Sequence, residues 1–171
     1  MNKHPFDQLT LNRGGAFIFT PCPGTKETSI ADSISQLKEV GVQAIVTLMY
    51  DDELKKHNAQ SLATECEKQS VSWFQLPISD EDAPNEDFLA AMKTHLASIL
   101  LIIERKGTVA VHCKGGSGRT GLVIGLLMYQ LGYQKEEIIS LVQALRPKAL
   151  KHPVQLDYFK TFELLGVEND D

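Results

Sequence analysis

A short strand, a glycine-rich loop and an apolar helix follow one another between residues 108 and 131, and this succession constrains the fold more than any other feature. Thr108–His112 is a compact run containing β-branched residues, which predicts a buried strand. Arg119–Leu131 is apolar on most faces and predicts a central, buried helix. A strand and a helix that are both buried are typical of a parallel sheet covered on both faces.

The rest of the chain also alternates strands with helices. Thr28 or Ser29 is expected to cap a first helix, which ends at Gly41. Asn85 is expected to cap a longer helix, which ends at Gly107. Predicted helices cover 30–40, the region around Leu62 and Cys66, 86–106, 119–131, 136–145 and 154–165 (closed by Gly166), and predicted strands cover 44–49, 73–76, 108–112 and additionally 16–19. Repeats and linker-like stretches are absent, so residues 1–171 are expected to form a single α/β domain with a central, largely parallel sheet flanked by helices.

The cysteines and the apolar runs limit where the protein works. Three cysteines, at positions 22, 66 and 113, cannot form a fully paired disulfide framework or a CxxC zinc site. The longest apolar run, around residues 99–103, falls far short of the ~18 residues of a membrane span, and residues 1–10 are too polar for a signal peptide. These observations favour a cytoplasmic protein with no metal, no cofactor and no membrane span.

Charge is unevenly distributed along the chain. The formal net charge of −5 argues against a general nucleic-acid binder. Residues 51–87 contain ten acids and three lysines, whereas residues 105–160 contain nine bases and three acids. The C-terminal half is therefore suited to an anion, although solvated helix faces would give the same split.

The loop that follows the predicted strand has the composition of an anion site. Glycines free the backbone for tight turns, so that successive N–H groups can point inward as a nest. The N-terminus of the next helix adds a partial positive charge, which favours phosphate. The predicted phosphate-binding residues are Lys114, Gly115, Gly116, Ser117, Gly118 and Arg119; for Lys114, a solvated side chain is the equal alternative.

Cys113 and Arg119 supply reactive chemistry at this loop. Neighbouring amides, the helix dipole and Arg119 all favour a thiolate over a thiol at Cys113. Arg119 returns to the same centre six positions later and offers a planar fork for two phosphate oxygens. This combination predicts attack of sulfur on phosphorus, with a phosphocysteine as the first product.

The segment His112-Cys113, five residues, then Arg119-Thr120 resembles the HCx5R[ST] signature of the protein tyrosine phosphatase superfamily. Three further segments, Pro23-Gly24, 76–80 and Arg146-Pro147 with Gln155, are similar to the kinase-associated dual-specificity phosphatases. The resemblance covers most of the chain. It implies a phosphatase fold and hydrolysis of phosphotyrosine and of phosphoserine or phosphothreonine in proteins, with a protein kinase as a candidate partner.

Hydrolysis of an alkyl phosphate needs a general acid for the poor leaving group. Asp80 is the candidate, because it follows a strand end and Pro77, and because the resembling family has its acid at the matching Pro-x-x-Asp position. Asp82 remains a rival, since a small loop shift exchanges clustered carboxylates. Both side chains would otherwise only solvate the loop or cap the next helix.

Further residues of the chain also have predicted positions or roles. The Thr120 hydroxyl is expected to help the sulfur leave, with an ordinary hydroxyl in the first turn of the helix as the alternative. His112 is expected to order the loop rather than to transfer protons, with a buried core histidine as the alternative. Gln155 would orient the hydrolytic water or be an ordinary exposed glutamine. Cys22 and Cys66 are expected to be buried or loop residues, not redox partners of Cys113.

The composition of the same loop is compatible with other functions. Gly116, Gly118 and Gly121 fit a GxGxxG dinucleotide fingerprint, but the acidic residue expected about 20 positions on is missing, and no Walker Gly-Lys-Ser/Thr occurs. A rhodanese-like sulfurtransferase, a non-catalytic phosphoprotein-binding module and an inositol-lipid phosphatase remain as alternatives. The leading hypothesis is a metal-independent protein phosphatase.

Overall fold

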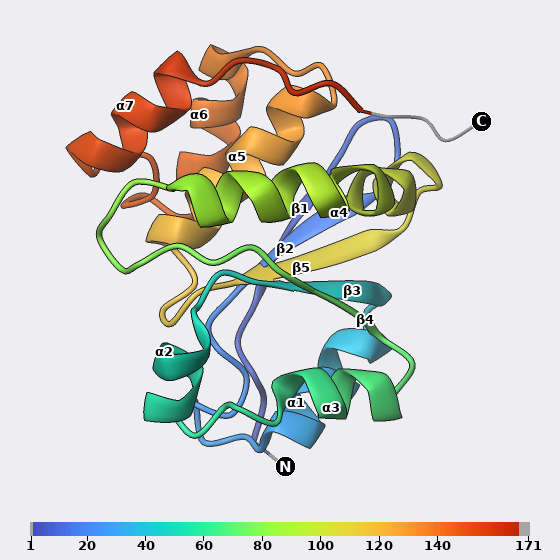
Figure 1. The fold of residues 1–171 in the computed structure, drawn as a ribbon. Coiled ribbons are helices and arrows are strands. Elements are labelled where there is room, and N and C mark those ends of the chain that lie inside the picture. The colour runs from blue at the N-terminus through green and yellow to red at the C-terminus, as the bar shows by residue number, and fades with distance from the viewer. Residues whose placement is uncertain (1, 168–171) are drawn as a thin grey trace.

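The computed structural model describes residues 2–167, and five strands in it form one sheet (Figure 1). Their order is β1-β2-β5-β3-β4, where only the β1–β2 pair is antiparallel. The strands are β1 Asp7–Thr10, β2 Ala16–Thr20, β3 Val42–Thr47, β4 Ser72–Gln75 and β5 Thr108–His112. The predicted α/β class with a largely parallel sheet is therefore confirmed, and β5, the strand before the glycine-rich loop, lies at its centre.

Seven helices cover the two faces of the sheet within the described residues. They are α1 Ile30–Glu39, α2 Asp51–Lys56, α3 Leu62–Lys68, α4 Glu86–Glu104, α5 Gly118–Gln130, α6 Lys135–Leu145 and α7 Pro153–Thr161. Figure 1 shows α4 to α7 on one side of the sheet and α1 to α3 on the other. Among residues 2–167, no helix is long and apolar enough to cross a bilayer.

Alternation along the strands divides the core into two clusters. Phe17 and Phe19 of β2 pack into the larger cluster with α4 and α5, whereas Ile18 between them packs into the cluster with α1 and α3. In β5, Val109 and Val111 point to the first side and Ala110 to the second. This period of two, buried on both faces, is the reason the strands are apolar throughout.

Several predicted helix ends are confirmed. The Ser29 side chain accepts a hydrogen bond from the amide of Asp32 at the start of α1, and Asn85 accepts from two amides at the start of α4. Gly41 follows α1 with φ +102°, in the left-handed region that favours glycine.

Other boundaries differ from the prediction. The third strand begins at Val42 and not at Ala44. The long helix ends at Glu104, before Gly107, because Lys106 takes a left-handed φ of 67°.

The last helix was predicted to reach Leu165 but ends at Thr161, and the next residue, Phe162, is extended and largely buried. Leu165 instead exchanges two hydrogen bonds with the side chain of Gln130, which replace the helical ones. Packing of Phe162 and this side-chain pairing thus outweigh the helical pattern. Strand β1 and helix α2 were not predicted.

Candidate active site

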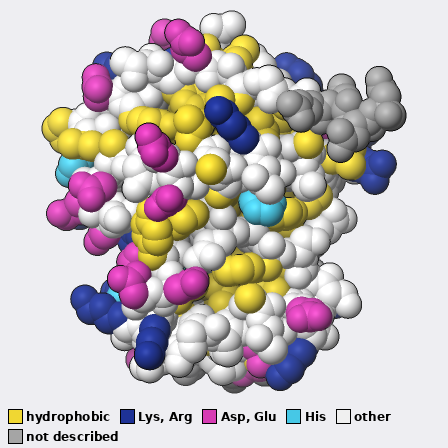
Figure 2. Space-filling view, viewed as in Figure 1, with side chains coloured by type: hydrophobic (Ala, Val, Ile, Leu, Met, Phe, Trp, Pro, Cys, Tyr) yellow, Lys and Arg dark blue, Asp and Glu magenta, His cyan; other side chains and the backbone are white. Residues whose placement is uncertain are grey.

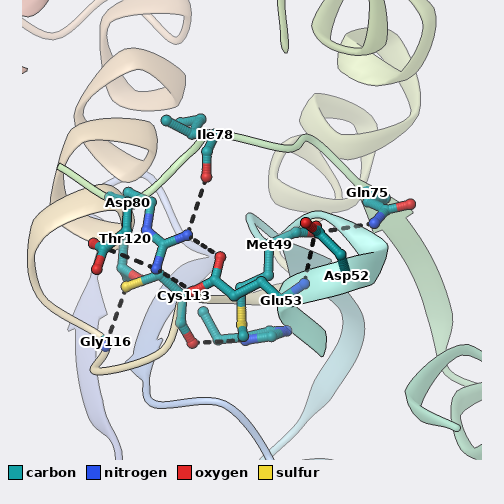
Figure 3. Close-up of polar contacts among 11 residues, drawn as sticks. Met49, Asp52, Glu53, Gln75, Ile78, Asp80, Cys113, Gly116 and Thr120 are labelled. Carbon is teal, nitrogen blue, oxygen red and sulfur yellow. Dashed lines mark hydrogen bonds and ion pairs between the residues drawn. The ribbon is translucent and has the colours of Figure 1, made fainter. Parts of the chain in front are cut away.

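Cys113 begins the loop between β5 and α5 and is 4% exposed. The amide of Gly116 donates a hydrogen bond to its Sγ at 3.2 Å, and the hydroxyl of Thr120 donates another at 3.2 Å (Figure 3). Two donors directed at one sulfur stabilise its charged form. The loop lies at the carboxyl end of the central strand, where ligands bind in open α/β sheets.

The carbonyl groups of the loop are held away from its interior. The Cys113 carbonyl accepts from His112 Nδ1 at 3.0 Å, and the Lys114 carbonyl accepts from the Cys22 amide at 3.1 Å. The Gly116 carbonyl accepts from Arg146 Nε at 3.1 Å, and the Ser117 carbonyl accepts from the Gly121 amide at 2.7 Å. In a trans peptide the N–H points opposite to the C=O, so an outward carbonyl turns the next N–H inward. These contacts thus build the anion nest that the glycines only permit.

The three glycines in the first part of the loop, Gly115, Gly116 and Gly118, are not equally required for its turn. Only Gly116 has a positive φ, +84°, and a Cβ there would lie 2.6 Å from the carbonyl carbon of Thr20. A Cβ at Gly115 would meet nothing within 4 Å, and one at Gly118 would touch Gln155 Oε1 at 3.4 Å. Among Gly115, Gly116 and Gly118, close packing therefore demands glycine only at Gly116.

Arg119 is 2% exposed and is held by an unpredicted partner, Glu53 of α2. Its Nη1 donates to Glu53 Oε1 at 2.7 Å and to the Ile78 carbonyl at 3.0 Å, and its Nη2 donates to Glu53 Oε2 at 2.8 Å (Figure 3). Burial alone lowers the pKa of Arg119, but the hydrogen bonds that it donates to Glu53 and the nearby negative groups raise this pKa above its ordinary value. Guanidinium has five N–H donors, so the Nε–H and one Nη2–H, which lie on the same side, remain for two oxygens of a phosphate.

Asp80 lies beside this arginine. Its Oδ1 is 3.5 Å from Arg119 Nη2, and its side chain is 72% exposed. The backbone N–H of Asp82 donates to the Ser79 carbonyl and closes the turn, with Glu81 between them at φ 62°. The turn thus brings Asp80, and not Asp82, into contact with Arg119.

Acidic side chains gather on the left of the face in Figure 2, over α2 and the loop before α4. The exposed acids of these segments include Asp51, Asp52, Asp80, Glu81 and Asp82. Part of the acidic segment, including Asp52 and Asp80, therefore lies at the rim of the site beside Lys114.

The other predicted site residues lie around the loop. Lys114 is exposed and lines a cleft of about 420 Å³ with Tyr50, Lys56 and His57. Ser117 is the N-cap residue of α5 but makes no side-chain cap bond. Gln155 of α7 is 4% exposed and lies against Gly118.

His112 is fully buried under the loop. Its Nδ1 contacts the Cys113 carbonyl, its Nε2 contacts Thr47 Oγ1 at 2.7 Å, and burial lowers its pKa to about 4. Both ring nitrogens are thus occupied within the protein.

All three cysteines are free and buried. Burial raises the pKa of Cys22 and of Cys66 to about 12, so both remain thiols at neutral pH. Within residues 2–167, no three His, Cys, Asp or Glu side chains gather as a metal-binding group.

Sequence reasoning missed two residues that hold the site. Glu53 stands in the run Asp51-Asp52-Glu53, which carries no signal beyond its charge, because the helix that directs it inward is short. Arg146 entered the sequence prediction only through the Arg146-Pro147 segment, which is similar to the kinase-associated dual-specificity phosphatases. Its Nη1 also contacts Asp7 of β1, and its Nη2 donates to the Phe19 carbonyl at 3.3 Å, so it joins the first two strands to the loop.

The fold and the cysteine–arginine loop define a member of the protein tyrosine phosphatase superfamily, of the dual-specificity type. The model of the family described as "Polymorphic toxin system, DSP-PTPase phosphatase" matches residues 22–133. The chain belongs to this family of phosphatases.

Known proteins agree with this assignment. The tyrosine-protein phosphatase CDC14 of Saccharomyces cerevisiae is 38% identical over 81 residues, which are 47% of this chain and 14% of the yeast protein. That of Candida albicans is 31% identical over 94 residues, 54% of this chain and 17% of the relative. The chain thus spans less than a fifth of the length of these curated relatives.

Two solved structures cover nearly the whole fold. The structure of Tk-PTP in its active form has a TM-score of 0.62 and 30% identity, and the match covers 86% of this chain and 89% of that one. Kinase-associated phosphatase, solved with its catalytic-site cysteine replaced by serine, has a TM-score of 0.78 and 21% identity, and the match covers 93% of each chain.

Proposed function

We propose that residues 1–171 form a single catalytic domain that hydrolyses phosphotyrosine, and phosphoserine or phosphothreonine, in proteins through a phosphocysteine intermediate and without a metal ion. The observation that carries this proposal is the loop itself. It holds the Cys113 sulfur between two donors. It also holds a buried Arg119 whose Nε–H and second Nη2–H make no hydrogen bond within residues 2–167, although the exposed Asp80 lies 3.5 Å from Nη2.

The first step transfers the phosphoryl group to sulfur. The phosphate binds to the inward N–H groups and to the free side of Arg119, and the Cys113 thiolate attacks phosphorus. A P–S bond forms while the P–O bond to the leaving group breaks, and Asp80 gives its proton to the leaving oxygen. The 72% exposure of the Asp80 side chain and its 3.5 Å distance from Arg119 Nη2 support this role, because the leaving group departs toward solvent.

The second step returns the enzyme to its starting state. Water oriented by Gln155 attacks phosphorus and gives a proton to Asp80. The P–S bond breaks, which regenerates the Cys113 thiolate and releases inorganic phosphate. Thr120 supports the departing sulfur through the hydrogen bond that it already donates at 3.2 Å.

Substrate and location follow from weaker observations. The likeness to kinase-associated phosphatase supports a phosphorylated kinase as a candidate substrate and partner. An inositol-lipid phosphate is the second candidate, because a solved structure of PTPMT1 contains PI(5)P and its match covers 90% of this chain. Three free thiols support work in a reducing compartment such as the cytoplasm.

The test is hydrolysis of an aryl phosphate by the wild-type protein and by Cys113→Ser, with EDTA present. We expect activity only in the wild type and no loss to EDTA. Equal activity in both proteins, or activity lost to EDTA, would overturn the thiolate mechanism. A panel of phosphopeptides and phosphoinositides then separates the two substrate classes.

Asp80→Ala is expected to slow a phosphoserine peptide far more than an activated aryl ester, because only the alkyl oxygen needs strong protonation. The same pattern in Asp82→Ala would move the acid to that residue. Full turnover by Asp80→Ala on every ester would show that Asp80 is not the general acid.

A further inference from the structure

A chain of hydrogen bonds runs from the edge of the sheet to the backbone of Cys113. Trp73 Nε1 donates to Thr47 Oγ1 at 2.7 Å, Thr47 Oγ1 meets His112 Nε2 at 2.7 Å, and His112 Nδ1 meets the Cys113 carbonyl at 3.0 Å. The three side chains come from the neighbouring strands β4, β3 and β5, and Thr47 pairs directly with His112 across the sheet. Thr47 and His112 are fully buried.

The two ends of this chain determine the direction of every bond. An indole N–H can only donate, and a carbonyl oxygen can only accept. The Trp73 N–H therefore occupies the Thr47 oxygen as an acceptor, and the Nδ1 of His112 must carry a proton to satisfy the Cys113 carbonyl. In a neutral ring the Nε2 is then bare, so the remaining contact has one solution, in which the Thr47 hydroxyl donates to Nε2.

The protonation of His112 agrees with this single arrangement. Burial lowers its pKa to about 4, so the ring is neutral at physiological pH and exists as one of two tautomers. A proton on Nε2 would face the Thr47 oxygen and would leave a bare Nδ1 opposite the Cys113 carbonyl oxygen. Two acceptors 3.0 Å apart repel one another, and the first peptide of the loop would turn.

We propose that Thr47 is a positioning residue for the reaction: its hydroxyl selects the Nδ1–H tautomer of His112, which holds the Cys113 carbonyl outward and thereby aims the sulfur into the loop. This role rests on the proposed function, and Thr47 itself touches neither substrate nor sulfur. Trp73 supports it by occupying the hydroxyl oxygen.

Two substitutions at this position separate the hydroxyl from the shape of the side chain. Thr47→Val keeps the shape and removes the donor, whereas Thr47→Ser keeps the donor. Long-range 15N–1H spectra of histidine-labelled protein report the tautomer of each ring. We expect the Nδ1–H pattern of His112 in the wild type and in Thr47→Ser, and its loss in Thr47→Val.

The kinetic readouts follow the tautomer. In Thr47→Val, kcat on an aryl phosphate and the rate of Cys113 alkylation by iodoacetamide at pH 6 are both expected to fall about tenfold, which corresponds to one lost hydrogen bond. KM should change little, and Thr47→Ser should retain both rates. Trp73→Phe, which removes only the first donor, should give a smaller loss and keeps the test open if Thr47→Val does not fold.

Three results would overturn the assignment: an unchanged tautomer in Thr47→Val, a changed tautomer with unchanged kcat and alkylation, or equal losses in Thr47→Val and Thr47→Ser. Failure of the proposed function is a separate outcome. In that case the wild type hydrolyses no phosphate ester, while the spectra and the alkylation rates still answer the question about Thr47.

Discussion

Replacement of Gly116 by alanine tests whether close packing under the loop demands glycine. The added Cβ would lie 2.6 Å from the Thr20 carbonyl carbon and 2.8 Å from the Pro21 nitrogen. Both are backbone atoms, so no side chain can rotate away. A side chain at φ +84° costs about 1–2 kcal/mol, and displacement of packed atoms adds about 1–3 kcal/mol, so we expect Gly116→Ala to lose about 2–5 kcal/mol.

Gly115→Ala is the matched control, because its Cβ would meet nothing within 4 Å and its φ is not positive. Its unfolding free energy should stay within about 1 kcal/mol of the wild type, since the residue only loses the freedom of glycine. Urea and thermal unfolding measure both variants, and each kcal/mol corresponds to about 2–4 °C in Tm for a domain of this size. Equal Tm values for the two variants would refute the packing argument.

The loop must also move to accommodate an alanine at Gly116, and its amide would then leave the Cys113 sulfur. We therefore expect kcat/KM of Gly116→Ala to fall at least tenfold, even at temperatures where the variant is folded. The reason is the loss of one hydrogen bond to a charged group, and such a bond contributes about 1.5–3 kcal/mol. Wild-type kcat/KM in the folded variant would show that this amide does not serve the reaction.

Two further predictions concern charged groups. Glu53→Gln should lower kcat/KM about 10- to 100-fold, because one charge-assisted bond that orients Arg119 is worth about 1.5–3 kcal/mol. Asp52→Asn is the control and should retain activity, because the Asp52 carboxylate accepts from the backbone amide of Glu53 and not from Arg119. Equal effects of the two substitutions on kcat/KM would refute the orienting role of Glu53. Burial lowers the pKa values of His4 and His112 to about 4. Between pH 6.5 and 4 the unfolded chain therefore binds more protons than the folded chain. The free energy of unfolding then falls on acidification, by up to about 1.4 kcal/mol per pH unit for each histidine. Urea unfolding at pH 7, 6 and 5 should show this slope, and an unchanged slope in His4→Asn would contradict the assignment of His4.

The central βαβ arrangement was predictable because its signals are local. The run Thr108–His112 matches β5 residue for residue, and α5 begins one residue before the predicted Arg119. A buried strand must be apolar over its whole length, and a glycine-rich turn before an apolar helix has few structural alternatives. Cys113, Thr120 and Arg119 meet because this one segment folds locally.

The parts that escaped prediction depend on distant contacts. Strand β1 buries only Leu9 in its four residues, so its pattern is too short to recognise. Helix α2 has six residues with three acids in its first turn and one buried side chain, Leu54. Its pairing of Glu53 with Arg119 spans 66 positions, and no spacing rule connects residues at that distance.

The loop shows why a conformation rich in inward amides needs support from several elements. Without outside partners, the loop carbonyls would compete with the amides for the interior and would face the sulfur, where two negative ends repel. The structure removes this competition: β5 supplies His112, the segment after β2 supplies the Cys22 amide, and the end of α6 supplies Arg146, which Asp7 of β1 holds in place. Asp7 and Arg146 lie outside residues 22–133, the part that matches the family model. The anion nest of this chain is therefore completed by segments on both sides of the matched region.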